Sequence, residues 1–154
     1  ISCGFSTHAL AGGFRSRLVT EVHVSSPQCM PHFVLLRHEC PHNHPRPSHW
    51  DLMLEADGVL WTWVLDVPLA DRELTTNVER LADHRMAYLE YEGEVSNNRG
   101  TVSQVDRGTY TSTNRDTTGR RRLRATLCGG HLRGELNLVE TSDPYWELTW
   151  SPAA

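Results

Sequence analysis

Hydrophobic and polar residues alternate over short stretches of this chain, and turn-forming residues separate the stretches. The clearest stretch is 49–56, where apolar and polar residues largely alternate, as is typical of a strand with one buried face. Asp57-Gly58 follows directly and is a strong hairpin-turn signal, and the residues after it are rich in branched and aromatic side chains. The pattern therefore predicts a β-hairpin over 49–66.

The same criteria predict further short strands, over 33–39, 88–91, 101–105, 123–127, 132–139 and 145–150. Residues 40–48 contain three prolines and are expected to form a loop, and a turn is expected at 106–108. Residues 71–82 carry apolar side chains at helical spacing, which predicts a short amphipathic helix. Many short strands with little helix predict a mainly β fold, a small antiparallel β-barrel with one or two short helices.

The length of 154 residues is that of one domain. Residues 1–29 lack the apolar stretch of a secretory signal, so we expect a disordered extension there, with Met30 as a plausible start and the folded domain over 30–152. The four cysteines have no Cys-x-x-Cys spacing, which favours a reducing, cytoplasmic location. No apolar run approaches a membrane span, so we expect no membrane partner. We also expect a monomer.

The formal net charge of −4 gives no overall attraction to nucleic acid, and all basic residues are arginines. The one dense basic run is 120–124, Arg-Arg-Arg-Leu-Arg. Such a run can follow a nucleic acid backbone, but it is equally typical of a solvated hairpin end. Composition therefore leaves nucleic acid binding open.

The candidate chemistry lies on the polar face of 49–56. His49, Asp51 and Glu55 share that face, and His38 lies on the preceding predicted strand. Two imidazoles and one carboxylate suit a divalent transition metal, although a single strand histidine is more often structural. Histidines 42 and 44, with Cys40, could extend this site or form a zinc cluster, but exposed loop histidines are the better interpretation.

The order of motifs along the chain resembles the 3′-phosphoesterase domain of the bacterial DNA ligase D family. The resemblance covers about residues 33–150. It is carried by His38, by His49-Trp50-Asp51-Leu52-Met53-Leu54-Glu55, by Gly58-Val59-Leu60-Trp61-Thr62-Trp63, by Asp83-His84, Tyr88, Glu92-Gly93 and Gly100-Thr101-Val102, by Asp106-Arg107-Gly108-Thr109-Tyr110, and by 132–139 and 146–148. Each motif is weak alone, and the ordered set is fairly specific.

The resemblance implies a compact β-barrel that removes 3′ phosphates and 3′ ribonucleotides from DNA or RNA-containing ends. It implies Mn²⁺, or another divalent transition metal, held by His38, His49 and Asp51. It further implies that His84 contacts the scissile phosphate and that Tyr88 lies in the same pocket, both as catalytic residues. Partners would be nucleic acid 3′ ends and a separate ligase or repair protein.

The sequence departs from the family pattern at several positions. Met53 stands where the family usually has Arg, Leu65-Asp66-Val67 where it has a Pro-Lys pair, and Thr62 where it has Ser; the loop at 40–48 is also longer than usual. Losing two basic residues weakens phosphate binding. Candidate replacements are Arg37, Arg46 and Arg80, and candidate supporting residues around the site are Glu55, Asp83 and Thr62.

Two other functions stay open. A non-catalytic module that binds nucleic acid ends or a repair partner is favoured by the missing basic residues. A 2-His-1-carboxylate iron oxygenase would use His49, Asp51 and His84, but would leave His38 without a role. The tryptophans on predicted strands, Trp61, Trp63, Trp146 and Trp150, are interpreted as core.

Overall fold

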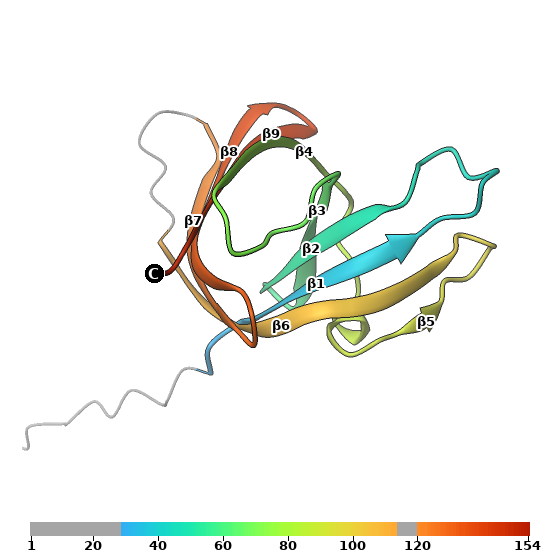
Figure 1. The fold of residues 1–154 in the computed structure, drawn as a ribbon, viewed down its shortest axis with the longest axis horizontal. Helices are drawn as coiled ribbons and strands as arrows, with labels where there is room; N and C mark the ends of the chain where they lie inside the picture. Colours follow the sequence, from blue (N-terminus) through green and yellow to red (C-terminus); the bar gives the residue numbers. More distant parts are fainter. Residues whose placement is uncertain (1–28, 114–119) are drawn as a thin grey trace, which may run out of the picture.

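Nine strands form one antiparallel sheet in the part of the chain that the computed structural model describes, residues 29–113 and 120–154. Their hydrogen-bonded order is β1-β2-β3-β4-β9-β8-β7-β6, and β6 pairs back onto β1 to close a barrel (Figure 1). The short β5 is added to β6 outside this ring. The predicted mainly β, antiparallel barrel is confirmed, whereas the expectation for residues 1–29 lies outside the described residues apart from residue 29.

The elements have the following bounds: β1 His32–Glu39, β2 His49–Ala56, β3 Val59–Leu65, β4 Leu74–Arg80, the 3₁₀ helix η1 Met86–Leu89, β5 Gly93–Glu94, β6 Thr101–Thr113, β7 Arg122–Gly129, β8 Arg133–Ser142 and β9 Tyr145–Pro152. The predicted hairpin over 49–66 is β2–β3. Its turn residues Asp57 and Gly58 have φ angles of 53° and 78°, as a two-residue hairpin turn requires. None of the described helical segments is long and apolar enough to cross a membrane.

Two separate apolar clusters give β1, β2 and β3 two buried faces. The barrel interior holds the larger cluster, with Phe33, Leu52, Trp63 and Trp150 at its centre. The outer face of the same strands carries a second cluster, which includes Val34, Leu36, Met53, Leu60, Val95 and Val102 and is covered by Met86, Tyr88 and Leu89 of η1. Burial on both faces explains why the first strand is continuously apolar instead of alternating.

The helix predicted over 71–82 is wrong, because residues 74–80 form β4. The apolar residues Leu74 and Val78 are four apart, a spacing that fits a helical face and also one face of a strand. β4 pairs with β9 over six residues, from Leu74 opposite Trp150 to Glu79 opposite Tyr145. This pairing, together with the poor helix propensity of Thr75, Thr76 and Asn77, decides for the strand.

Two further local predictions are wrong. The strand expected at 88–91 is replaced by η1, which begins at Met86 and ends at Leu89. The turn expected at 106–108 lies inside β6, which runs on to Thr113. A register shift opposite Leu35 and Leu36 leaves Val105 unpaired, so the turn-like residues there form a bulge in a continuous strand.

Asp106, next to this bulge, fixes the turn between β7 and β8. Its side chain is buried, and its two oxygens accept backbone N–H groups from Gly130 at 3.0 Å, His131 at 2.9 Å and Leu132 at 2.6 Å. An added Cβ at Gly129 would come within 2.4 Å of the Asp106 carboxylate, so only glycine allows this approach. Asp106 thus has a structural role that the family motif alone does not reveal.

Candidate metal centre

The three predicted metal ligands meet on the outer face of the barrel, near the end where β1 and β2 extend beyond it (Figure 1). His38 and His49 are directly opposite each other in the β1–β2 register. Asp51 is opposite Leu36, two residues further along on the same face. Strand alternation and antiparallel pairing are sufficient to bring these side chains together.

The donor atoms of the three side chains lie at distances suited to a common ion. His38 Nδ1 is 3.3 Å from Asp51 Oδ2, and His49 Nε2 is 3.3 Å from Asp51 Oδ1. The two imidazole rings are 4.8 Å apart between centroids. Ligand atoms about 2.1 Å from one ion, at angles of about 90–110°, lie roughly 3.0–3.4 Å from each other. The spacing therefore fits a bound cation.

Main-chain carbonyls orient both imidazoles. His38 Nε2 is 2.8 Å from the Arg99 carbonyl, and His49 Nδ1 is 2.8 Å from the Pro47 carbonyl. A neutral imidazole that donates its N–H to the carbonyl turns a lone-pair nitrogen, His38 Nδ1 or His49 Nε2, toward Asp51. A carboxylate facing two lone pairs is unfavourable, and either a bound cation or a proton on an imidazole removes this repulsion.

Burial and charge at Asp51 also support a cation bound at this site. Burial raises its pKa, but interaction with His38 and His49 outweighs this effect and lowers the pKa to about 2. The contact with Asp51 raises the pKa of His38. Asp51 Oδ1 is buried without a hydrogen-bond partner among the described residues, because its contact with His49 lacks hydrogen-bond geometry. An ionised, incompletely partnered carboxylate between two imidazoles is a fitting metal ligand.

Cys40 offers a second possible donor set. Its sulfur is 3.9 Å from His49 Nδ1, and the donors of His38, Cys40 and His49 lie within 4.8 Å of one another. This set would use the His49 nitrogen that faces the Pro47 carbonyl. Burial and the charge of Asp51 raise the pKa of the Cys40 thiol, which disfavours the thiolate. The donors of the Cys40 set also lie close together, and it is the contact of His49 with the Pro47 carbonyl and the raised pKa of Cys40 that favour the set with Asp51.

Cobalt(II) distinguishes the two sets. We expect Co²⁺ to bind without the intense near-ultraviolet band of a cobalt–thiolate bond, because the ligands are imidazole and carboxylate. Cys40→Ser should change the Co²⁺ dissociation constant by less than about threefold, because Cys40 is not a ligand in this set and the Pro47 carbonyl at 2.8 Å, not the Cys40 sulfur at 3.9 Å, orients His49. Absorption titration of both proteins measures this. A thiolate band that disappears in Cys40→Ser would instead assign Cys40 as a ligand.

The other loop histidines are not part of this group. His44 Nδ1 contacts the backbone of Arg46 within the same loop, and His42 is exposed. Neither belongs to a cluster of metal donors within the described residues. The preferred interpretation of these two as loop residues agrees with this placement.

His84 and Tyr88 lie on the segment that follows β4 along β3. The backbone of His84 pairs with Leu60, and its ring meets the ring of Tyr88 edge-on at 5.5 Å. His84 Nδ1 is 2.9 Å from the Ala82 carbonyl, which leaves Nε2 as the nitrogen available to a ligand. No hydrogen bond or ring contact joins His84 to the three-residue group in the described parts of the chain. An iron site built from His49, Asp51 and His84 is therefore less well supported than one that uses His38.

Of the three candidate phosphate-binding arginines, the structure brings Arg46 to the outer face. Its guanidinium pairs with Glu79 at 2.8 and 3.1 Å, and Glu79 lies in the same row as Asp51 through its pairing with Val64. Arg37, adjacent to His38, points to the opposite face and stacks on Trp50 at 4.1 Å.

Arg80 also lies on the opposite face. Its guanidinium is 5.0 Å from the centre of the Trp63 ring, and it pairs with Asp83 at 2.7 Å. The candidate supporting residue Asp83 is therefore engaged away from the three-residue group.

The remaining predicted supporting residues lie further along the outer face. Glu55 is four residues beyond Asp51, about 13 Å along an extended strand, and pairs with His32 at 2.9 Å. Thr62 is fully buried beside Met53, and its hydroxyl donates to the Leu60 carbonyl. Met53 itself belongs to the outer apolar cluster and supplies packing where the resemblance implies a cation.

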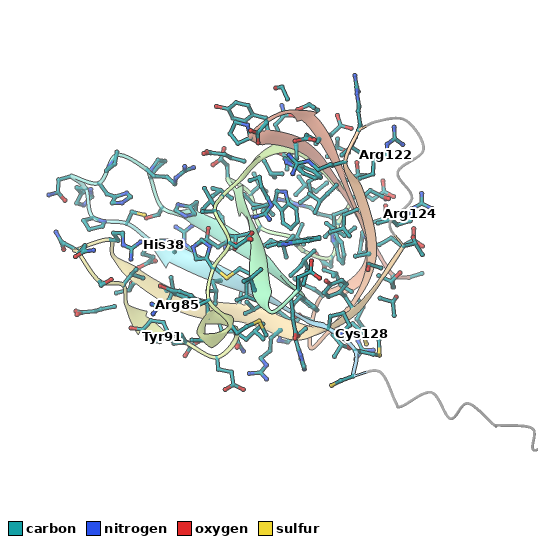
Figure 2. All side chains as sticks on the ribbon, turned by 180° about the vertical axis from the view of Figure 1, so that it is seen from behind. His38, Arg85, Tyr91, Arg122, Arg124 and Cys128 are labelled. Atoms are coloured by element: carbon teal, nitrogen blue, oxygen red, sulfur yellow. The ribbon has the colours of Figure 1, made fainter. Side chains whose placement is uncertain are left out.

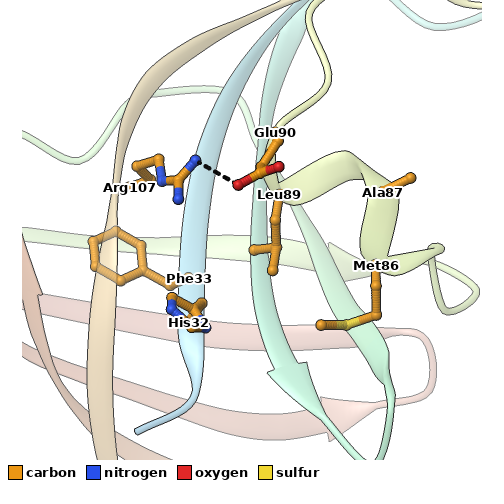
Figure 3. A pocket seen from close by; sticks show the side chains of 7 residues that line it. All are labelled: His32, Phe33, Met86, Ala87, Leu89, Glu90 and Arg107. Carbon is orange, nitrogen blue, oxygen red and sulfur yellow. Dashed lines mark hydrogen bonds and ion pairs between the residues drawn. The ribbon is translucent and has the colours of Figure 1, made fainter. Parts of the chain in front are cut away.

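A hollow of about 270 Å³ at the other end of this face lies beneath η1 (Figure 3). It is lined by His32, Phe33, Met86, Ala87, Leu89, Glu90 and Arg107, and Arg107 pairs with Glu90 at 3.5 Å. None of the predicted site residues lines it. The hollow is therefore separate from the candidate metal centre.

The carbonyls of Arg99 and Pro47, which orient the imidazoles, were not predicted from the sequence. Gly100 brings one of them into place, because its φ of 96° and its contact with the Glu39 carbonyl, 1.8 Å from a would-be Cβ, leave no room for a side chain. The Asn97-Asn98-Arg99-Gly100 run was a recognisable turn signal, but its contact with β1 is long-range.

Comparisons with known proteins identify the family to which this chain is similar. A family model described as the DNA ligase D 3′-phosphoesterase domain matches residues 40–140, a range that includes His49, Asp51, His84 and Tyr88. The multifunctional non-homologous end joining DNA repair protein LigD of Mycobacterium tuberculosis strain H37Rv is 33% identical over 122 residues. The corresponding LigD of Mycobacterium bovis is also 33% identical over 122 residues. These matches cover 74% of this chain but 15% of each relative, so the chain spans a small part of their length.

Proposed function

The chain belongs to the DNA ligase D 3′-phosphoesterase domain family, and we propose that it is a metal-dependent 3′-phosphoesterase that trims nucleic acid ends during DNA repair. The proposed reaction removes a 3′ phosphate or a 3′ ribonucleotide. The observation that carries the proposal is the arrangement of His38, His49 and Asp51, in which one nitrogen of each imidazole lies 3.3 Å from an oxygen of Asp51. Family membership supports the type of reaction, and the donor set supports its dependence on metal.

The residues of the chain have distinct parts in this proposal. His38, His49 and Asp51 hold Mn²⁺ or another divalent transition metal, which would neutralise charge on a phosphate oxygen and orient a water molecule. His84 presents Nε2 to the substrate while its Nδ1 donates to Ala82. Its Nε2 can therefore exchange a proton with a reacting oxygen of the substrate. Tyr88 keeps the His84 ring in position through their edge-on contact.

Phosphate binding relies on fewer cations than the resemblance implies. Arg46 is the candidate arginine on the outer face, and Glu79 raises its pKa and holds it by two hydrogen bonds. A substrate phosphate would compete with Glu79 for this guanidinium. We therefore propose that Arg46 contacts the phosphate only when substrate is bound.

The proposed setting is cytoplasmic, with a monomer acting on DNA or RNA-containing 3′ ends. The relatives are named as multifunctional end-joining proteins, whereas this chain corresponds to a small part of them. We propose that a separate ligase or repair protein seals the ends that it prepares.

A 3′-end processing assay tests the proposal. We expect release of inorganic phosphate from a primer–template with a 3′ phosphate in the presence of Mn²⁺, and none in the presence of EDTA. His84→Ala should lower the rate by about 100-fold or more, because general acid–base groups contribute about 10²–10⁴-fold. The exposed His42→Ala variant is the matched control. Full turnover in EDTA would contradict the proposal.

Met53 gives a specific reason to keep the non-catalytic alternative. It is 1% exposed within the outer apolar cluster, and residues 65–67 supply no cation nearby. A chain that binds the 3′-phosphorylated primer–template but releases no phosphate would be a module that recognises ends. The same assay, combined with a binding measurement, therefore separates the two functions.

A further inference from the structure

A cleft of about 260 Å³ opens at the barrel end where β3 and β4 part. Only Trp63–Arg80 and Val64–Glu79 pair between these strands, and beyond them β4 continues with β9. The inward-facing residues of β3 line the cleft, whereas the outward-facing residues of the same strand face the candidate metal centre. The cleft and the metal centre are thus on opposite faces of β3.

Three indoles form the apolar part of the cleft. Trp63 and Trp146 are 1% and 5% exposed and meet edge-on at 5.7 Å, while Trp61 is partly exposed. The Nε1 groups of Trp63 and Trp146 have no hydrogen-bond partner among the described residues. By contrast, Trp150 donates its Nε1–H to the Ala70 carbonyl at 2.7 Å. In an edge-on pair one N–H at most can point at the other ring, so at least one buried donor lacks an acceptor.

Three arginines complete the lining. Arg80 lies against Trp63 and pairs with Asp83, and Arg121 lies 5.7 Å from the Trp146 ring and pairs with Glu140. Arg122 also borders the cleft, but it precedes the inward-facing Leu123, so its side chain lies with that of Arg124 on the outer face of β7 (Figure 2). Arginine and tryptophan side chains are donors only. Among the described residues, the side chains that line this cleft therefore offer aromatic surface and guanidinium donors, and the carboxylates that pair with Arg80 and Arg121 lie outside the lining.

We propose that this cleft binds one nucleotide of a single-stranded nucleic acid, with the base against Trp61 and the phosphate on Arg121, where it would compete with Glu140. A nucleotide supplies what the lining lacks, namely acceptor oxygens, negative charge and a flat ring. Bases stack on aromatic side chains regardless of sequence, and arginine binds phosphate through two N–H groups. The volume suits one nucleotide and excludes a duplex.

The cleft chemistry stands apart from the proposed catalysis. Arg80, a sequence candidate for phosphate binding, lines this cleft and not the metal centre. The choice of a nucleic acid strand as the ligand rests on the proposed function. The preference of the cleft for an acceptor-rich, anionic, planar group does not depend on that function. The cleft would hold a nucleotide other than the 3′-terminal nucleotide that is being trimmed.

Binding is tested with a fluorescein-labelled single-stranded dT8 that ends in a 3′ hydroxyl, in EDTA, so that no metal or 3′ phosphate contributes. Anisotropy gives the dissociation constant over a series of salt concentrations. Arg121→Glu should weaken binding about tenfold and reduce the slope of log Kd against log salt by about 1. Arg124→Glu is the matched control, because Arg124 lies nearby on β7 outside the cleft and bonds Asn137.

Trp61 gives an independent measure. Trp61→Leu should weaken binding about tenfold through loss of stacking, and Trp61→Phe should retain most of the affinity. Circular dichroism checks that both variants fold. Unchanged binding in Trp61→Leu would overturn the proposal.

Three other outcomes would also overturn it. Equal losses in Arg121→Glu and Arg124→Glu would assign binding to the outer face of β7. Competition by free dTMP at the same concentration as unlabelled dT8 would assign the cleft to free nucleotides, and equal competition by an octaglutamate peptide would assign it to acidic protein segments. Because phosphate release is not measured, inactivity in the 3′-end assay would leave these results interpretable.

Discussion

His49→Ala is expected to abolish metal-dependent turnover and to weaken Mn²⁺ binding by at least about 100-fold. Outer contacts of metal ligands are worth about 10–100-fold in affinity, so loss of a direct ligand should cost more. His49 contributes Nε2 opposite Asp51 Oδ1 at 3.3 Å, and it is 3% exposed. Its removal leaves Asp51 and His38 as the remaining donors of this set. Isothermal titration with Mn²⁺ and the 3′-phosphate assay measure the two losses.

A second variant separates ligation from folding. His49→Gln preserves most of the buried volume but removes the imidazole, and it should lose turnover while unfolding close to the temperature of the wild type. The exposed loop variant His42→Ala should keep both metal binding and activity. Full turnover in a folded His49→Gln protein would remove His49 from the metal centre, and with it the proposed mechanism.

Asp106→Ala is expected to lower the free energy of unfolding by roughly 3–5 kcal/mol, because it removes three hydrogen bonds to a charged acceptor, each worth about 1.5–3 kcal/mol, and water can replace part of the loss at the two half-buried donors. The three N–H groups of Gly130, His131 and Leu132 would lose their common acceptor. For a domain of this size the unfolding temperature should fall by roughly 10–15 °C. Thermal and urea unfolding measure the change, and Asp71→Ala, at an exposed carboxylate, is the control.

The effect of Asp106 should depend on pH in a defined direction. Burial raises its pKa, but the backbone N–H groups outweigh burial and hold the pKa below its ordinary value. Its contribution is therefore complete above the unfolded pKa of about 4 and is lost as pH falls through the lower native value. The difference in stability between wild type and Asp106→Ala should stay constant from about pH 6 to 8 and shrink below about pH 4. A difference that grows on acidification would contradict this role.

The parts of the fold with strong local signals could be predicted from the sequence. Alternation over 49–56 and the Asp57-Gly58 turn predicted β2 and β3, because both signals act within a few residues. β4 could not be predicted in this way. Its residues are compatible with two periods, and the choice depends on β9, about seventy residues later in the chain.

In the candidate site, too, one part could be predicted from the sequence and another part could not. His38, His49 and Asp51 converge because of alternation and register, which the pattern contains. Alternation could also have excluded Arg37, since neighbours on a strand point to opposite faces. The carbonyls of Pro47 and Arg99 could not be found, because every residue has a carbonyl and only the loop path brings one to an imidazole.

Reliance on carbonyls has a consequence for how this centre tolerates change. Because the orienting groups belong to the main chain, residues 47 and 99 can be exchanged widely without loss of the acceptors, provided that the loops keep their course. Gly100 is the exception, since its packing on Glu39 sets that course. Diversity should therefore accumulate in the side chains of both loops, and a single methyl group at residue 100 should do more harm than any exchange at residue 99.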